Sequence, residues 1–256
     1  MSQVEYGPLA DYYELINENS VPYDEQAAFA SRLLEEFGAQ WTAPRILDIA
    51  CGPGLLSGRL RGRGLEVIGV DLAEVLLAQA VHRGRGRFVR GDMRQLPFRG
   101  SFHLACCLLH TINYMTNDDD LACAFRSIAA ALRPGGLAAV DFIAYEPRSE
   151  WRVQWSETVR GAGVRIVCSH DQVPNWRRMV AIDRHTYTVH ERERTWSVSG
   201  EDHLRITSAS EMRAFAVRCG LEPVTVCGKY DLGAGLGPDG GVLVARRPDR
   251  QRASVD

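Results

Sequence analysis

Between residues 25 and 143 the sequence alternates short apolar segments with segments of helical period, and this alternation limits the fold more than any other feature. The segments that are typical of helices are 25–37, 55–61, 73–82 and 121–132, and those that are typical of buried strands are 45–50, 66–70, 86–90, 103–109 and 137–142. Strands that alternate with helices pair in parallel, and the helices cover both faces of the sheet. The sequence therefore predicts an α/β fold with a mostly parallel sheet.

The pattern changes after Tyr145. Residues 146–206 contain β-branched and aromatic stretches that are separated by turn residues and show no helical period. We expect them to form a small antiparallel sheet of about three strands. Helical spacing returns in residues 207–219, and residues 222–230 and 241–246 are typical of two further strands. The antiparallel sheet is therefore predicted to interrupt the α/β fold and not to follow it.

The composition excludes several classes of partner. The 256 residues are 45% apolar and 24% charged, as in a globular domain with a sizeable core. The net charge of −2 gives no electrostatic footprint for nucleic acid or for an anionic membrane, so we expect a small-molecule partner. The seven cysteines include no Cys-x-x-Cys pair, and the first residues show no basic segment followed by an apolar one. We therefore expect a cytoplasmic protein that binds neither nucleic acid nor membrane.

A strand that runs into a glycine turn, Ile46–Leu56, is the first segment that indicates chemistry. Gly52 and Gly54 let backbone amides approach a ligand closely, and the N-terminus of the following helix favours negative charge. A dinucleotide-binding turn places a third glycine or alanine where Ser57 stands here. Asp48, near the end of the strand, would repel a pyrophosphate but would suit a cation. We therefore expect a ligand with an ammonium or sulfonium centre in preference to a nicotinamide dinucleotide.

Acidic residues also follow the next two predicted strands. Asp71 stands where a carboxylate can accept both hydroxyls of a ribose, although it could instead cap the following helix. After the third strand, Asp92 can accept from an exocyclic amine and Met93 can lie against a purine ring, although Asp92 could also be an ordinary loop acid. The carboxyl ends of parallel strands meet at one edge of a sheet. The three features therefore predict a single crevice at the switch point of the sheet.

These segments resemble the motifs of the class I S-adenosylmethionine-dependent methyltransferases, in the same order and at the same spacing. The motifs are Leu47–Gly54, Val70–Asp71, Gly91–Met93 and Leu132–Gly136. The resemblance implies a Rossmann-like, seven-stranded, mostly parallel sheet with helices on both faces, an antiparallel last strand, and the inserted antiparallel sheet. It also implies S-adenosyl-L-methionine as cofactor and S-adenosyl-L-homocysteine as product. The cofactor residues that it implies are Asp48, Ala50, Cys51, Gly52 and Gly54 for the methionine part, Asp71 and Leu72 for the ribose, Asp92 and Met93 for the adenine, and Leu109.

A narrower resemblance is to small-molecule N-methyltransferases of the amino-sugar type and of the glycine or sarcosine type. It rests on Tyr12–Leu15, on Gly91–Arg94, on Leu109–Tyr114 and on the inserted sheet. In such enzymes an N-terminal helix folds over the cofactor and contributes a tyrosine to the methionine carboxylate. That resemblance makes Tyr13 and Tyr23 the candidates for this contact. Where some relatives carry a further tyrosine, this sequence has Asn17.

Methyl transfer from a sulfonium needs an aligned nucleophile and a dry site, and it needs a base only when the acceptor carries a proton. His110 follows the fourth predicted strand directly and is therefore the candidate base, although it could merely cap the strand end. Asn113, Tyr114 and Tyr145 are the candidates for substrate binding, although Tyr114 could equally pack under the helix.

The inserted segment holds four histidines, at positions 170, 185, 190 and 203. Strand alternation puts His185 and His190 on opposite faces, and no Cys/His pairing accompanies them, so we expect no metal site. Four tryptophans, at positions 151, 155, 176 and 196, could form an aromatic wall or simply pack in the core. We expect one face of this sheet to roof an acceptor pocket or to pack against a second subunit of a homodimer.

The sequence thus predicts a methyltransferase that acts on a nitrogen or oxygen of a small metabolite, in secondary metabolism. Two alternatives stay open: a noncatalytic cofactor-binding subunit or sensor with the same fold, and an NAD(P)-dependent oxidoreductase. The expected domains are 1–145 with 207–247 for cofactor binding, 146–206 for substrate or dimer contacts, and 248–256 as a flexible tail.

Overall fold

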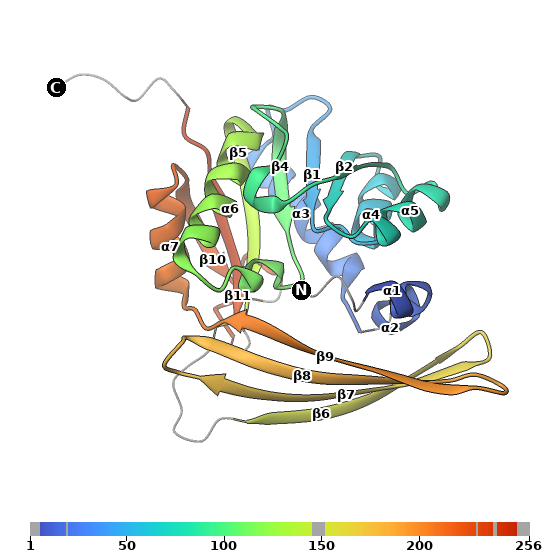
Figure 1. Ribbon diagram of the computed structural model, residues 1–256. Helices are drawn as coiled ribbons and strands as arrows, with labels where there is room; N and C mark the ends of the chain where they lie inside the picture. The colour runs from blue at the N-terminus through green and yellow to red at the C-terminus, as the bar shows by residue number, and fades with distance from the viewer. Residues whose placement is uncertain (1–5, 19, 145–151, 229, 238–239, 250–256) are drawn as a thin grey trace.

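The computed structural model describes residues 6–18, 20–144, 152–228, 230–237 and 240–249, and these form two sheets with flanking helices (Figure 1). The larger sheet has seven strands in the order β10-β11-β5-β4-β1-β2-β3. Its strands are β1 (Arg45–Ile49), β2 (Glu66–Asp71), β3 (Arg87–Arg90), β4 (Phe102–Cys107), β5 (Leu132–Phe142), β10 (Glu222–Cys227) and β11 (Gly241–Arg246). Strands β1 to β5 pair in parallel, and β11 is antiparallel to both of its neighbours. The predicted fold class is confirmed.

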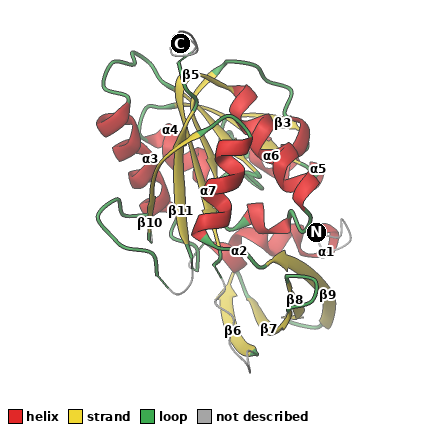
Figure 2. Ribbon diagram, turned by 90° about the vertical axis from the view of Figure 1, so that its left-hand side faces the viewer, coloured by secondary structure: helices red, strands yellow, loops and turns green. Residues whose placement is uncertain are grey.

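Helices cover both faces of this sheet (Figure 2). The helices that follow the first turns of the chain are α3 (Tyr23–Phe37), α4 (Leu55–Gly62), α5 (Glu74–His82), α6 (Asp118–Ala131) and α7 (Ala209–Arg218). On one face α6 and α7 pack against β1, β4 and β5 in a core that includes Phe125 and Phe215. On the other face α3 and α4 pack in a core that includes Phe29 and Leu60. Burial of these apolar faces is the main stabilising contribution to the layered fold.

The second sheet is inserted between β5 and α7 and lies beyond the carboxyl ends of the parallel strands (Figure 1). It has four antiparallel strands, β6 (Val153–Gly161), β7 (Val164–Asn175), β8 (Val180–His190) and β9 (Thr195–Arg205), in that order. The expectation of about three strands was therefore short by one. The additional strand, β6, is an edge strand whose side chains are mostly exposed, and Glu157 interrupts the alternation of Val153, Trp155 and Val159, so its apolar pattern is weak.

The N-terminal segment packs against the inserted sheet. Its short helices are α1 (Tyr6–Leu9), a 3-10 turn at Ala10–Tyr12 and α2 (Tyr13–Asn17). Leu9 and Ile16 share a small apolar cluster with Ile166, Cys168 and Val189. These helices therefore lie between the inserted sheet and the larger sheet, over the edge where β1 and β2 end (Figure 1).

Within the described part of the chain no helix is both long enough and apolar enough to cross a membrane. The division into a cofactor domain (1–145 with 207–247) and an inserted region (146–206) stays a prediction. Of the predicted tail 248–256, residues 250–256 lie outside the described residues, as does Tyr145.

Candidate active site

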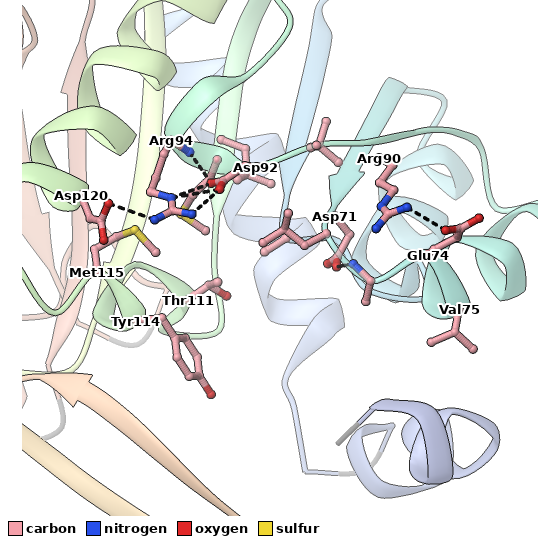
Figure 3. A pocket seen from close by; sticks show the side chains of 17 residues that line it. Asp71, Glu74, Val75, Arg90, Asp92, Arg94, Thr111, Tyr114, Met115 and Asp120 are labelled. Carbon is pink, nitrogen blue, oxygen red and sulfur yellow. Dashed lines mark hydrogen bonds and ion pairs between the residues drawn. The ribbon is translucent and has the colours of Figure 1, made fainter. Parts of the chain in front are cut away.

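A cleft of about 450 Å³ opens at the carboxyl ends of β1 to β4, where the sequence predicted a crevice (Figure 3). It is lined by Ile49, Ala50, Val70, Asp71, Leu72, Ala73, Glu74, Val75, Arg90, Gly91, Asp92, Met93, Arg94, Thr111, Tyr114, Met115 and Asp120. Asp71 and Asp92 lie on either side of it, because β2 and β3 end side by side. The structure thus brings together five of the predicted cofactor residues: Ala50, Asp71, Leu72, Asp92 and Met93.

The glycine turn after β1 forms one wall of the site. Gly52 and Gly54 have φ values of 52° and 76°, in the left-handed region that favours glycine. A Cβ at Gly54 would lie 2.8 Å from Cζ of Phe88, so the turn has no room for a side chain there. A Cβ at Gly52 would lie 3.6 Å from the hydroxyl of Tyr13. The turn therefore presents bare backbone to the space beneath the N-terminal helices.

Asp71 is held by backbone amides on both of its oxygens. Its Oδ2 accepts from the N–H of Gly52 at 2.7 Å, and its Oδ1 accepts from the N–H of Ala73 at 2.8 Å. Burial raises the pKa of this carboxyl above its usual value, and the two amides act in the opposite direction. Each carboxylate oxygen can accept a second hydrogen bond, so Asp71 can bind a ligand hydroxyl without releasing the turn.

Asp92 is paired with Arg94. The guanidinium donates to both oxygens of Asp92, with Nε–Oδ2 at 2.9 Å, and it also reaches Asp120 at 3.0 Å. Hydrogen bonds from Arg94 hold the pKa of Asp92 below its usual range. Met93 is buried beside this pair and lines the cleft together with Met115. An ionised acceptor next to two polarizable side chains suits a flat heterocycle that carries an amino group.

Asp48 lies behind the glycine turn and does not line the cleft. It is 2% exposed, and its Oδ2 accepts from the hydroxyl of Ser57 at 2.6 Å. Burial raises the pKa of Asp48 to about 7. The side chain of Cys51 is also buried, and its Sγ would lie 2.7 Å from a Cβ on Gly69. Asp48 and Cys51, two of the predicted cofactor residues, therefore pack behind the glycine turn and do not line the cleft.

A second cavity of about 240 Å³ adjoins the first and shares Ala50, Asp71, Thr111 and Tyr114 with it. Its remaining walls come from three parts of the chain. The N-terminal helices supply Leu9, Tyr13, Ile16 and Asn17; the larger domain supplies Gly52, Leu76 and Leu109; and the inserted sheet supplies His185, Tyr187 and Asp202. The hydroxyl of Tyr114 donates to Oδ2 of Asp202 at 3.0 Å, which joins the two sheets across this cavity.

The chain between β4 and α6 is held in an unusual conformation at the edge of this cavity. Leu109 and His110 both have positive φ, 60° and 54°. Their N–H groups donate to the two oxygens of the buried Asp141, at 3.0 and 2.6 Å. Left-handed residues other than glycine cost energy and persist where the surroundings impose them, commonly at functional sites. Asp141 thus fixes Leu109 against the second cavity.

His110 does not line either cavity. Its imidazole is 44% exposed, and its Nε2 lies 4.0 Å from Oδ2 of Asp141. The predicted role of His110 as a base therefore stays a prediction, and the imidazole that lines the second cavity is that of His185. Sequence reasoning missed His185 as a site residue because nothing in the sequence says which face of the inserted sheet meets the cleft.

Asn113 is buried, with 1% exposure, and its amide is used structurally. It donates to the carbonyl oxygens of Ile143 and Arg205, at 3.1 and 2.9 Å, and accepts from the N–H of Ile143 at 3.0 Å. The residue therefore ties the turn after β4 to both ends of the insertion. A contact of Asn113 with substrate stays a prediction, and its observed contacts make it a positioning residue.

Tyr23 lines neither cavity, whereas Tyr13 lines the second one, and a contact of Tyr23 with the cofactor stays a prediction. Its ring is buried in the core beneath α4, under the guanidinium of Arg59 at 5.7 Å. The residues that sequence reasoning missed in the first cavity include Thr111 and Met115, which flank the segment already singled out at His110. Thr111 stands inside the segment Leu109–Tyr114 on which the narrower resemblance rests, and Met115 directly follows that segment.

Comparison of the sequence with known protein families agrees with these features. Residues 46–136 match the family model for a methyltransferase domain. These residues belong to a methyltransferase domain. The resemblance that the motifs suggested is thereby confirmed, and with it S-adenosylmethionine as the cofactor of this class.

The methyltransferase domain has relatives of several kinds. It is 32% identical over 141 residues to YqeM of Bacillus subtilis, a protein named as a provisional methyltransferase, which covers 53% of this chain and 54% of that one. It is 33% identical over 100 residues to the dTDP-4-amino-2,3,4,6-tetradeoxy-D-glucose N,N-dimethyltransferase of Saccharopolyspora spinosa, which covers 39% of this chain and 40% of that one. The chain spans about half the length of the first curated relatives it matches.

Solved structures extend the likeness over the whole fold. The sugar N-methyltransferase KedS8 from a Streptoalloteichus species superposes with a TM-score of 0.78 at 22% identity and covers 93% of each chain. A SAM-bound amino pentose methyltransferase from Micromonospora echinaspora, CalS10, gives a TM-score of 0.75 at 23% identity, with 92% of this chain and 96% of that one covered. At these identities the likeness establishes the fold, including the inserted sheet.

Proposed function

We propose that this protein transfers the methyl group of S-adenosylmethionine to a nitrogen atom of a small, sugar-like metabolite in secondary metabolism. The observation that carries the proposal is the pair of joined cavities. One lies at the ends of β1 to β4 with the residues of a donor site, and the other lies between Gly52, the N-terminal helices and the inserted sheet. Donor and acceptor then meet where the two cavities share Ala50, Asp71, Thr111 and Tyr114.

The residues in the first cavity fit the donor. Asp71 has lone pairs available for ribose hydroxyls, and Asp92 with Met93 suits an adenine. When bound, S-adenosylmethionine supplies a methyl group that is already activated by its sulfonium. The protein's own task is then to orient the acceptor and to exclude water.

Three elements of this chain meet that task in the second cavity. Tyr13 lies over Gly52 from the N-terminal helices, Leu109 is fixed by Asp141, and the inserted sheet closes the remaining side. These side chains come from separate segments and together enclose the cavity. The proposal does not require a base that touches the acceptor. An acceptor amine in its free-base form is nucleophilic by itself.

The charges of the second cavity favour an amine over an alcohol as the acceptor. Asp71 and Asp202 line it, and among its described lining residues there is neither lysine nor arginine. Carboxylate oxygens accept hydrogen bonds, so a cavity with carboxylates and no basic side chain suits a neutral amine with its N–H donors and disfavours an anion. Two curated relatives are named as N,N-dimethyltransferases of dTDP-linked amino sugars, which agrees with a nitrogen acceptor.

The experiment that tests the donor site compares Asp71→Ala with the wild-type protein by calorimetric titration of S-adenosylhomocysteine. Loss of charge-assisted hydrogen bonds to the ribose should weaken binding by roughly 1–3 kcal/mol. Glu74→Gln is a matched control, since that exposed carboxylate lines the same cavity and pairs with Arg90 at its rim. Equal affinities for Asp71→Ala and the wild type would refute the ribose assignment.

The acceptor class is tested with labelled donor and paired amino and hydroxy analogues of deoxysugars. We expect transfer to the amines, together with a raised KM for amines in Asp202→Asn. The two rival functions give different results: a noncatalytic sensor binds the donor and methylates neither series, and an NAD(P)-dependent oxidoreductase is stabilised by NAD(P) more than by S-adenosylhomocysteine. The proposal includes a cytoplasmic location and no nucleic-acid partner, as the composition indicated, and a homodimer stays the proposed oligomer.

A further inference from the structure

The face of the inserted sheet that meets the site carries, beside its apolar cluster, a group of polar side chains that are largely buried. His170 on β7 and His185 on β8 are directly paired across the strands, and Asp183 lies two residues before His185 on the same face. All three side chains are at least 87% buried, with exposures of 13%, 4% and 10%. Buried polar side chains are normally matched to partners, so a cluster of this kind calls for an explanation.

The three side chains converge on one point. Each offers one ligand atom, and these atoms all lie within 4.8 Å of one another. Nδ1 of His170 lies 3.0 Å from Oδ2 of Asp183, and Nδ1 of His185 lies 3.9 Å from the same oxygen. Metal–ligand bonds of about 2.0–2.2 Å in a tetrahedral zinc site put neighbouring donor atoms roughly 3.4 Å apart. The two observed separations bracket that value.

The charges of this face are also unbalanced. Asp183 is directly opposite Asp202 on β9, and like charges in that position repel. One oxygen of each, Oδ1, is buried and has no hydrogen-bond partner. Two arginines of strands β8 and β9 pair with other carboxylates, Arg184 with Glu201 and Arg205 with Asp118 and Glu211. A bound cation would supply the missing counter-charge.

We propose that His170, Asp183 and His185 bind a divalent first-row transition metal ion of the Zn²⁺ type. Two imidazoles and one carboxylate are a common ligand set for such ions, with further positions left open. Trp155 stacks on the imidazole of His170 with centroids 4.4 Å apart and shields that ligand from water. Since His185 also lines the second cavity, the ion's open position lies beside the acceptor.

The sequence argued against a metal because strand alternation separates His185 from His190. That argument holds within one strand, but the cross-strand register supplies His170 as the second imidazole. The register of a hairpin cannot be read from alternation alone. The inference does not depend on the methyltransferase activity, because metal binding is measured without donor or acceptor.

The test uses the full-length protein after treatment with a chelator, titrated with Co²⁺ and then with Zn²⁺. We expect one equivalent of Co²⁺ to give the visible absorption of a low-coordinate site, Zn²⁺ to displace it, and Zn²⁺ to raise the melting temperature. His170→Gln and the isosteric Asp183→Asn should each weaken Co²⁺ binding by at least about 10- to 100-fold. His203→Gln is the matched control, since His203 pairs with the carboxylate of Glu201 at 2.8 Å and is exposed.

Two results would overturn the proposal. One is a wild-type protein without a visible band or a thermal shift at one equivalent of metal, which would make the cluster a hydrogen-bonded triad. The other is a band that survives in Asp183→Asn and His170→Gln, or that is lost equally in His203→Gln, which would locate the ion elsewhere. Circular dichroism of each variant separates loss of the ligand from loss of the fold.

Discussion

Replacing Asp48 with asparagine is expected to raise the free energy of unfolding relative to the wild type, and to raise it by more at neutral pH than at acidic pH. Asp48 is 2% exposed, and its Oδ2 accepts a hydrogen bond from the hydroxyl of Ser57 at 2.6 Å. Asparagine keeps the shape of the side chain and an oxygen that accepts from Ser57, and it removes the charge. The substitution therefore isolates the cost of ionising a buried carboxyl group behind the glycine turn.

The size of the effect follows from the pKa of Asp48. Burial raises this pKa from 3.8 to about 7 in the folded protein. As the pH rises from about 4 to 7, the unfolded chain releases this proton and the folded protein retains it, so the folded state loses about 1.4 kcal/mol per pH unit. The full loss is about 4 kcal/mol. The contribution of Asp48 is thus favourable below the unfolded pKa and is lost as the pH rises through the folded pKa.

Urea denaturation of both proteins between pH 4 and pH 8 measures this directly. The difference in free energy of unfolding, Asp48→Asn minus wild type, should grow by about 4 kcal/mol across that range. Glu35→Gln removes an exposed carboxylate on α3 and should show no comparable growth. Parallel stability curves for Asp48→Asn and the wild type would show that Asp48 ionises normally in the folded protein and would refute the reasoning.

Three further substitutions test the walls of the site. Asn113→Ala removes three buried hydrogen bonds and should lower the free energy of unfolding by about 3 kcal/mol in urea denaturation; a loss below 1 kcal/mol would contradict its positioning role. Gly54→Ala should weaken binding of S-adenosylhomocysteine, measured by calorimetry, because its Cβ would clash with Phe88, and unchanged affinity would mean that the turn relaxes. Tyr230→Phe removes a buried hydrogen bond to Asp141 and should cost about 1.5–3 kcal/mol in thermal denaturation; an unchanged melting temperature would argue against it.

The cleft at the carboxyl ends of β1 to β4 could be predicted because its position follows from local features of the sequence. Asp71 ends a strand and precedes a helix, and its place in a parallel sheet follows from that position alone. The same reasoning located Asp92, Met93 and the glycine turn. It failed to show that Asp48 lies behind the turn, because the burial of a side chain at a strand end depends on what packs over it.

The second cavity could not be predicted because it is assembled from distant segments, although two of its lining residues, Tyr13 and Leu109, were among the predicted cofactor residues. Tyr13, Leu109 and Asp202 come together only when the N-terminal helices and the inserted sheet are placed on the larger domain. The position of His110 beside the fourth strand was right, but its backbone turns left-handed there and its imidazole misses both cavities. Periodicity determines neither a left-handed turn nor the face that an inserted sheet presents.

The insertion leaves and rejoins the larger domain at one place. Ala144, after β5, and Thr207, before α7, form a parallel bridge, and Asn113 binds the backbone on both sides of this junction. When the two ends of an insertion lie side by side, an insertion of another length can take its place without distorting the parent fold. An insertion of another length would therefore leave the larger sheet and the cleft at its carboxyl ends in place.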